Sequence, residues 1–239
     1  MDKNNDTTAD AGGVMPVIAE KSGQAIVSLR LVSSRRLQQL VPEPLVVHSV
    51  LPGLALYAVG AFLYSEIRVG HERGSTRSWC GVSDAAIIIP VLGPNDSVAW
   101  FLPRLYNTCP EVIEWAAGQR LPKIEAGIDW RQKGRQICVR VARPTGSGER
   151  LEIHGRQRFG LPEWIWKLGP LRAVARSTLL VNDNGSIRRF AYVFKSIGRA
   201  SYCSVSCVAD GIAMPTPWLS FGCVLSGFAG FVIEAGQPI

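Results

Sequence analysis

The sequence predicts a mainly β (α+β) fold, in which an antiparallel sheet closes or half-closes into a barrel or cone and carries few short helices. The apolar runs are short, and they either alternate with polar residues or are rich in β-branched residues, as in "QICVRVARP" and "AAIIIPVL". Turn sequences such as "NDNG" and "PTGSGE" separate these runs. The 239 residues also include 24 glycines and 15 prolines, more than a helical bundle needs.

The start of the chain differs in composition from the rest. Residues 1–22 are predicted to form a flexible tail, and residues 23–239 a single β domain. The segment "MDKNNDTTADAGG" lacks the apolar core of a signal peptide. None of the six cysteines forms a C-x-x-C pair, so we expect reduced thiols, a cytoplasmic location and no metal site.

Two long apolar stretches raise the question of a membrane. Residues 46–64 are long enough to span a bilayer, but they contain His48 and Pro52 and fit two strands joined near "LPG" better. Residues 211–233 contain two prolines and predict a loop followed by a strand. A membrane-associated protein is therefore the less favoured alternative.

Two helices are expected. The segment "SSRRLQQLVPEPL" predicts a short helix that begins at one of its first two serines and ends before Pro42. The segment "TCPEVIEWAAGQ" predicts a well-formed helix near residues 109–118, with Thr108 and Glu111 as a capping box. Gly118 supplies the stop signal of this second helix.

Basic residues give the chain a net charge of +7 and a pI near 9.3, which favours anionic partners. The segment "RRFAYVFKSIGR" mixes cations with aromatic residues, but its alternation fits a half-buried strand better than a nucleic-acid platform. The segments "RQKGRQ" (131–136) and "GRQRFG" (155–160) are interpreted as ordinary basic turns. No nucleic-acid partner and no membrane partner are therefore predicted.

One lysine lies at a position that local chemistry does not explain. The turn "GQRLP" follows the second predicted helix and brings Lys123 to the first position of a strand. Alternation places Lys123, Glu125 and Asp129 on one face of that strand and Ile124 on the other. Lys123 is either an exposed residue that pairs with Glu125 or a buried amine that performs chemistry.

The segment "FLPRLYNTCPEVIEWAAGQRLPKIEAG" (101–127) is similar to the central segment of the acetoacetate decarboxylase superfamily. In that family a strand, a turn and a short helix lead to a Pro-Lys pair that carries the Schiff-base lysine, and Pro122-Lys123 matches this pair. Two upstream segments also resemble the family, "LQQLVPEPL" (37–45) and "LYSE" (63–66). The fold that the resemblance implies is the β cone of the acetoacetate decarboxylase type.

The resemblance implies roles for four residues. Lys123 would form the Schiff base, and Glu66 would orient the substrate or relay a proton as a second catalytic residue. Arg30 and Tyr64 would bind the substrate, a small keto acid, without metal or cofactor and in a homo-oligomer. The true decarboxylases of the family carry a second lysine after the first, and this sequence has Ile124 there.

A lysine amine attacks a carbonyl only when it is unprotonated. Its ordinary pKa is about 10.4, so work near pH 7 requires a pKa that is lower by about 3. Burial can lower the pKa, and the resulting iminium then stabilises a carbanion. The sequence therefore predicts a Schiff-base-forming lyase (a carboxy-lyase or an enzyme of related carbon–carbon bond chemistry). The alternative is a non-catalytic small-molecule-binding barrel.

Overall fold

The structure is a computed structural model that describes residues 17–70, 76–93, 97–144, 148–162, 176–193, 198–212, 214–233 and 237–238. Its two described helices are α1 (Ser34–Gln38) and α2 (Pro110–Gly118). The described strands are β1 (Val17–Ser33), β2 (Val46–Val47), β3 (Ser49–Leu51), β4 (Leu54–Gly70), β5 (Thr76–Leu92), β6 (Val98–Asn107), β7 (Ile124–Glu125), β8 (Gly127–Lys133), β9 (Gln136–Ala142), β10 (Arg150–Gly160), β11 (Arg176–Asp183), β12 (Ser186–Val193), β13 (Arg199–Asp210), β14 (Leu219–Ile233) and β15 (Gln237–Pro238).

All described strands belong to one mixed sheet. Its order is β15-β12-β11-β6-β5-β4-β1-β14-β13-β10-β9-β8, and β2, β3 and β7 pair with β5, β4 and β6. The pairings are antiparallel except where β6 meets β11 and β7. The mainly β prediction is confirmed, but the sheet is not a closed barrel. β14 pairs with β1 and β13, and it also meets β12 at one position, Tyr192 opposite Ile233. The strands from β12 to β14 are therefore half-closed, and β13, β10, β9 and β8 extend the sheet beyond them.

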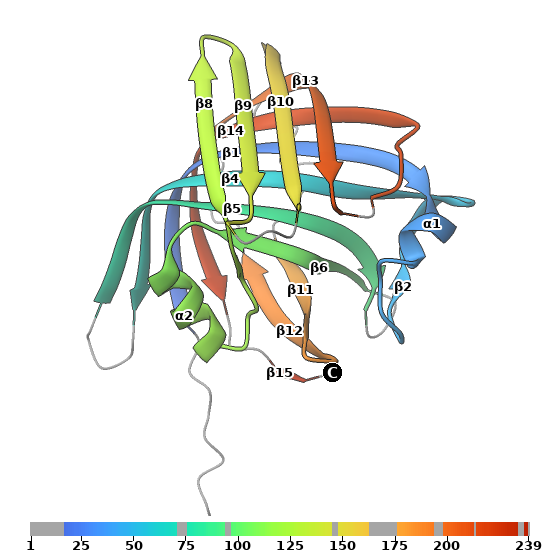
Figure 1. The fold of residues 1–239 in the computed structure, drawn as a ribbon, viewed down its shortest axis with the longest axis horizontal. Helices are drawn as coiled ribbons and strands as arrows, with labels where there is room; N and C mark the ends of the chain where they lie inside the picture. Colours follow the sequence, from blue (N-terminus) through green and yellow to red (C-terminus); the bar gives the residue numbers. More distant parts are fainter. Residues whose placement is uncertain are drawn as a thin grey trace, which may run out of the picture.

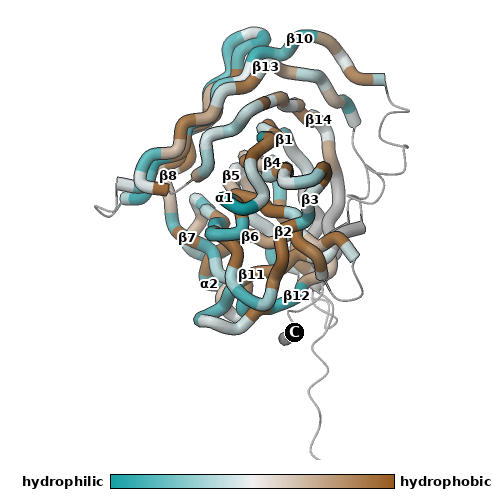
Figure 2. Tube along the Cα trace, turned by 90° about the vertical axis from the view of Figure 1, so that its right-hand side faces the viewer, coloured by the Kyte–Doolittle hydropathy of each residue, from teal (hydrophilic) through white to brown (hydrophobic). Residues whose placement is uncertain are grey.

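We call the four strands β13, β10, β9 and β8 the arm. Figure 1 shows β14, β1, β4, β5 and β6 side by side, with the arm crossing at one side and α2 lying near one end of β6. In the side view of Figure 2 the arm forms an arc around the inner strands and carries many hydrophilic residues. The arm therefore has one face toward the inner strands and one toward solvent.

The buried apolar side chains form two clusters on opposite faces of β1, β4 and β5. The arm cluster lies between these strands and the arm, and it includes Ile26, Tyr57, Val139 and Ile153. The inner cluster lies on the other face, and it includes Tyr64, Val82, Leu102, Val112, Leu121, Val181, Phe190 and Phe228. Since side chains from β4, β6, β12 and β14 meet in the inner cluster, the sheet curls around it.

Most of the expected elements are present. Both helices lie where the sequence predicted them, and residues 46–64 form β3 and much of β4, joined near "LPG". Residues 211–212 and 214–218 belong to no strand, and β14 follows them, as expected for a loop and a strand. Within the described part of the chain, no helix is long and apolar enough to cross a membrane.

Three expectations need correction. The chain is already in β1 at Val17, so the predicted tail of residues 1–22 is too long, and residues 1–16 lie outside the described residues. The N-cap of α2 is Cys109 rather than Thr108, whose side chain instead accepts a hydrogen bond from the Ser83 amide at 3.0 Å. The sequence also failed to predict β13, because "SYCSVSCVAD" has few large apolar residues to reveal its alternation.

A β-bulge interrupts β4 beside β1. The register passes from Ser22 opposite Glu66 to Gly23 opposite Tyr64, so Ser65 is an extra residue on β4. A bulge changes the face that later side chains take, because the period of side chains along a strand is two. Ile67 therefore lies in the inner cluster with Tyr64, although three positions separate them.

Gly23 allows the two strands to approach at this bulge. A Cβ atom added to Gly23 would lie 2.0 Å from the carbonyl oxygen of Leu63, which is a backbone atom that cannot rotate away. Any larger residue would therefore have to displace β4 at the point where its faces change.

The variant Gly23→Ala tests this close approach. We expect its free energy of unfolding to fall by about 1–3 kcal/mol, the usual cost of overpacking, in urea denaturation at constant m-value. Gly160→Ala in β10 is the matched control, because its added Cβ meets no atom within 4 Å, and its effect should stay below about 0.5 kcal/mol. Equal effects of the two substitutions would contradict the assignment.

Candidate active site

Lys123 is a buried amine held by a carboxylate. Its Nζ donates to both carboxylate oxygens of Asp84, at 2.8 and 3.0 Å. The side chains of Lys123 and Asp84 are only 3% and 6% exposed. Of the two interpretations that the sequence left open, the structure thus supports burial, and Asp84 takes the place expected for Glu125.

Asn107 holds the Asp84 carboxylate from the neighbouring strand. Asp84 on β5 lies opposite Asn107 on β6, and the Asn107 Nδ2 donates to the Asp84 Oδ1. The Asn107 Oδ1 accepts a hydrogen bond from the amide of Cys109 at 2.7 Å, which fixes the orientation of the side-chain amide. Asn107 is fully buried, so these bonds also satisfy polar atoms that water cannot reach.

The turn after α2 delivers Lys123 to this position. The amides of Arg120 and Leu121 donate to the carbonyls of Ala117 and Ala116 at 2.9 Å, the pattern of a Schellman motif. Arg120 adopts the left-handed conformation with φ of 58°, so it is Arg120, two residues after Gly118, that turns the chain. The chain then enters β7, which runs parallel to the end of β6.

Apolar groups surround the ion pair. Leu121, two residues before the lysine, is 5% exposed and belongs to the inner cluster. Val82 and Ala86 flank Asp84 on the same face of β5 and lie in the same cluster. Burial of two opposite charges among apolar groups is costly for each charge alone, so the pair depends on its mutual contact and on Asn107.

Asp84 and Asn107 were not predicted from the sequence. A strand was predicted from "AAIIIPVL", which left Asp84 just outside its start, whereas β5 already begins at Thr76. The available signal was a carboxylate adjoining a continuous apolar run, where an acidic residue is unusual unless it has a partner. Nothing in the sequence indicates that this partner is Lys123, 39 residues later.

Tyr64 is brought close to this site. It is 3% exposed and belongs to the inner cluster that also contains Leu121. Its ring stacks on Phe62 with centroids 6.2 Å apart, and Phe62 lies opposite Asp84 in the β4–β5 register. Tyr64 is thus part of the wall near the ion pair, and its role in substrate binding stays a prediction.

Glu66 is not the group that contacts the Lys123 amine. Its Oε1 accepts a hydrogen bond from the Arg68 Nε at 2.7 Å, and its side chain is 32% exposed. The sequence placed Tyr64 and Glu66 on one face by simple alternation, but the bulge at Ser65 breaks that alternation. The structure therefore does not bring Glu66 to Lys123.

Arg30 lies on the opposite face of the sheet from Lys123. It is 8% exposed, its guanidinium carbon lies 5.7 Å from the centroid of the Tyr57 ring, and its Nη2 donates to the Cys207 carbonyl at 3.5 Å. Burial raises the pKa of Tyr57 to about 12, so this phenol stays neutral and does not balance the charge of Arg30. The structure therefore keeps Arg30 in the arm cluster, apart from the ion pair.

Comparisons with known proteins support one fold. No family model matches the sequence, and no curated protein matches it significantly. A solved acetoacetate decarboxylase from Legionella pneumophila subsp. pneumophila str. Philadelphia 1 superposes with a TM-score of 0.65 at 11% identity, covering 95% of this chain and 88% of the other. An acetoacetate decarboxylase-like enzyme from Sphingomonas wittichii RW1 superposes with 0.62 at 13% identity, covering 93% and 92%.

A third solved structure with this fold contains a bound keto acid. The enduracididine biosynthesis enzyme MppR complexed with pyruvate superposes with a TM-score of 0.64 at 11% identity, covering 97% of this chain and 94% of the other. The same enzyme has also been solved with the condensation product of pyruvate and imidazole 4-carboxaldehyde. At these identities the likeness concerns the fold.

The variant Asp84→Asn tests how much the buried ion pair contributes to the free energy of unfolding. Removal of one partner leaves a buried charge without compensation, so we expect the free energy of unfolding at pH 7 to fall by about 3–5 kcal/mol. Asp129→Asn is the matched control, because its pair with Arg131 is 46% and 70% exposed. Its effect should be about 0–1 kcal/mol in the same urea denaturation. A loss in Asp84→Asn as small as in the control would contradict the buried pair.

Proposed function

We propose that this chain, which has the fold of acetoacetate decarboxylase, is a Schiff-base-forming lyase that acts on a small keto acid through Lys123. The observation that carries the proposal is the buried Lys123 amine, which is held on Asp84 among apolar groups. A buried lysine without chemistry would be costly and would add little stability. A buried amine beside one proton acceptor has the parts that imine formation requires.

Asp84 would act first, as the acceptor of the proton from the Lys123 ammonium. Its carboxylate already accepts both hydrogen bonds from the Nζ, so the proton moves along an existing bond. Entry of an apolar substrate part that excludes water disfavours the two separate charges and favours the neutral amine and carboxylic acid. This transfer replaces the neighbouring cation of the family's decarboxylases, where this chain has Ile124.

The free amine then attacks the keto carbon and forms a C–N bond to give a carbinolamine. The proton held by Asp84 leaves with the carbinolamine hydroxyl as water, so Asp84 is again a carboxylate and the nitrogen is a protonated imine. This iminium accepts the electron pair of the carbon–carbon bond that breaks. When that bond joins the α carbon to the carboxylate, the carboxylate group leaves as CO₂. A proton from solvent adds to the enamine carbon and gives back an iminium. Hydrolysis of this iminium by one water releases the ketone and leaves Lys123 as the ammonium that binds Asp84.

Asn107 would position Asp84 in these steps. Its amide donates to the Asp84 Oδ1 and is itself oriented by the Cys109 amide at the start of α2. Asp84 therefore keeps the hydrogen bond from Asn107 when the lysine leaves it to form the imine. MppR, which has the same fold, has been solved with pyruvate and with a condensation product of pyruvate, and this supports a small keto acid as the substrate class.

A non-catalytic small-molecule-binding protein is the second candidate. The observation that favours it is that Arg30 lies in the arm cluster, so the expected carboxylate-binding arginine is not beside Lys123. A protein of this kind would bind a carbonyl compound reversibly and would form no covalent adduct.

Reductive trapping tests the first proposal against the second. Borohydride in the presence of pyruvate, acetoacetate or a simple aldehyde should leave one reduced adduct, located on Lys123 by peptide mass mapping. We expect the adduct to disappear in Lys123→Ala and also in Lys123→Arg, because a guanidinium keeps the charge but forms no imine. If folded wild-type protein gives no adduct with any of these carbonyls, the binding protein is the better account.

The role of Asp84 has its own trapping control. Asp84→Asn removes the proton acceptor and should slow trapping at pH 7 by about 10²-fold or more, within the usual range for general acid–base groups. Glu125→Gln makes the same carboxylate-to-amide change at an exposed residue two positions after Lys123 and should leave the rate unchanged. Equal rates in the two variants would exclude Asp84 as the proton acceptor and leave the role of Lys123 standing.

A further inference from the structure

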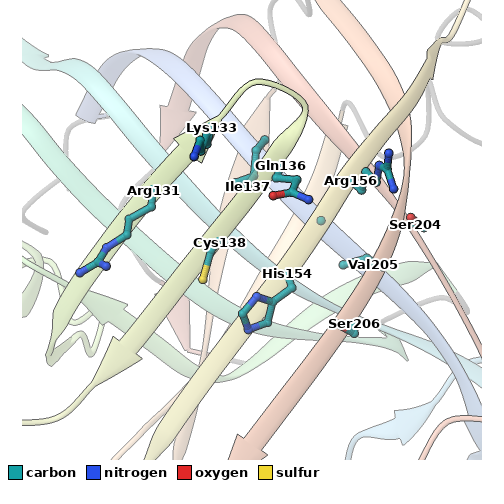
Figure 3. Close-up of a pocket in the computed structure, with 11 residues that line it drawn as sticks. Arg131, Lys133, Gln136, Ile137, Cys138, His154, Arg156, Ser204, Val205 and Ser206 are labelled. Atoms are coloured by element: carbon teal, nitrogen blue, oxygen red, sulfur yellow. The ribbon is translucent and has the colours of Figure 1, made fainter.

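The two basic segments 131–136 and 155–160 lie side by side on the arm. Gln136 on β9 is opposite Arg156 on β10, and the amide of Gln157 donates to the carbonyl of Arg135 at 2.9 Å. Together with β13 these segments border a hollow of about 560 Å³ on the solvent-facing side of the arm (Figure 3). The residues that line it come from β8, β9, β10 and β13, so the hollow is separate from the Lys123 site.

The side chains of the hollow follow two rows across the strands. Lys133, Gln136, Arg156 and Ser204 are successive register partners on β8, β9, β10 and β13 and form the upper row in Figure 3. The row below it consists of Arg131, Cys138, His154 and Ser206. Neighbouring strands lie about 4.8 Å apart, so Lys133 and Arg156 are separated by about 10 Å along their row.

The carboxylates near the hollow already have cationic partners. Asp129 accepts a hydrogen bond from the Arg131 Nε at 2.7 Å. Glu152 contacts Arg140, Arg150 and His154, and its hydrogen bonds with Arg150 and His154 hold its pKa at about 2. Glu152 is therefore ionised at neutral pH, and each of the two acids has a cationic partner on this face.

Two cations that line the hollow, Lys133 and Arg156, and a third beside it, Arg158, remain unmatched. Within the described residues, Lys133, Arg156 and Arg158 have no carboxylate partner, and Arg158 makes only a side-chain hydrogen bond to Ser204 at 3.3 Å. Arg158 is the extra residue of a β-bulge, since Gln157 pairs with Cys203 and Phe159 with Tyr202. The bulge thus adds a third cation beside Arg156, and the hollow has an excess of positive charge with neutral hydrogen-bonding groups between.

We propose that this hollow binds a small polyanion that carries two or three linked phosphate groups. Arginine donates two parallel hydrogen bonds to phosphate oxygens, and lysine adds a point charge. The row from Lys133 to Arg156 is longer than an orthophosphate ion and matches a short chain of phosphates. Gln136 and Ser204 add neutral donors along the same row.

The lining favours a small polyphosphate over single-stranded nucleic acid. Nucleic-acid grooves combine cations with aromatic rings on which successive bases stack. None of the residues that line this hollow is Phe, Tyr or Trp, and the one imidazole, His154, is bound to Glu152. The nearby rings of Phe159 and Tyr202 stack on each other, with centroids 5.1 Å apart.

Calorimetric titration of the full chain with inorganic triphosphate tests the proposal. We expect saturable one-to-one binding that weakens as salt is added, and binding of orthophosphate that is at least about tenfold weaker. Arg156→Gln should weaken triphosphate binding by about tenfold, as expected for one charge-assisted contact. Arg140→Gln makes the same charge change on the same face but affects a residue already bound to Glu152, and it should change binding by less than about twofold.

Cys138 supplies an independent readout, because its half-buried thiol lines the hollow. Triphosphate should slow its alkylation by iodoacetamide, measured by peptide mass mapping, while alkylation of the exposed Cys80 stays unchanged. Absence of saturable binding, or equal weakening in Arg156→Gln and Arg140→Gln, would overturn the proposal. Tighter binding of a single-stranded oligonucleotide than of triphosphate would also overturn it, in favour of a nucleic-acid partner. The outcome does not depend on Lys123 trapping.

Discussion

The Asp84–Lys123 ion pair is the interaction on which the rest of the candidate site depends. Both charges lie among apolar groups of the inner cluster, where neither would be stable alone. Their contact requires β5 and β6 to be in register, so that Asn107 meets Asp84, and requires the turn after α2 to end at Lys123. The ion pair therefore forms only when the strand pairing, the helix and the turn are all in place.

The curl of the sheet and its bulges decide which side chains meet. Side chains from distant strands reach the inner cluster because the sheet curls around it, and the bulge at Ser65 directs Tyr64 inward and Glu66 away. A second bulge, at Arg158, adds a cation to the solvent-facing side of the arm. One inserted residue in each strand thus changes the chemistry of a face without changing the fold.

The basic residues of this chain occupy three different environments. Lys123 is buried and neutralised by a carboxylate, whereas Arg30 is buried against an aromatic ring and a carbonyl. The arm cations are exposed to solvent, and several have no acidic neighbour within the described residues. We therefore propose imine chemistry for the buried Lys123 and attraction of anions for the exposed arm cations, because burial and partners differ between the two places.

The sequence by itself determined the mainly β class, both helices, most of the strands and the position of Lys123 after a Pro-containing turn, because these follow from local periodicity and turn chemistry. Only the tertiary structure decided that Asp84 and Asn107 hold Lys123, and that Glu66 and Arg30 make their contacts with Arg68 and Tyr57 instead. It also decided that residues 131–136 and 155–160 border one hollow. These outcomes depend on register, bulges and curl across residues far apart in the chain. A one-residue change in register exchanges the two faces of a strand, and no local pattern records it.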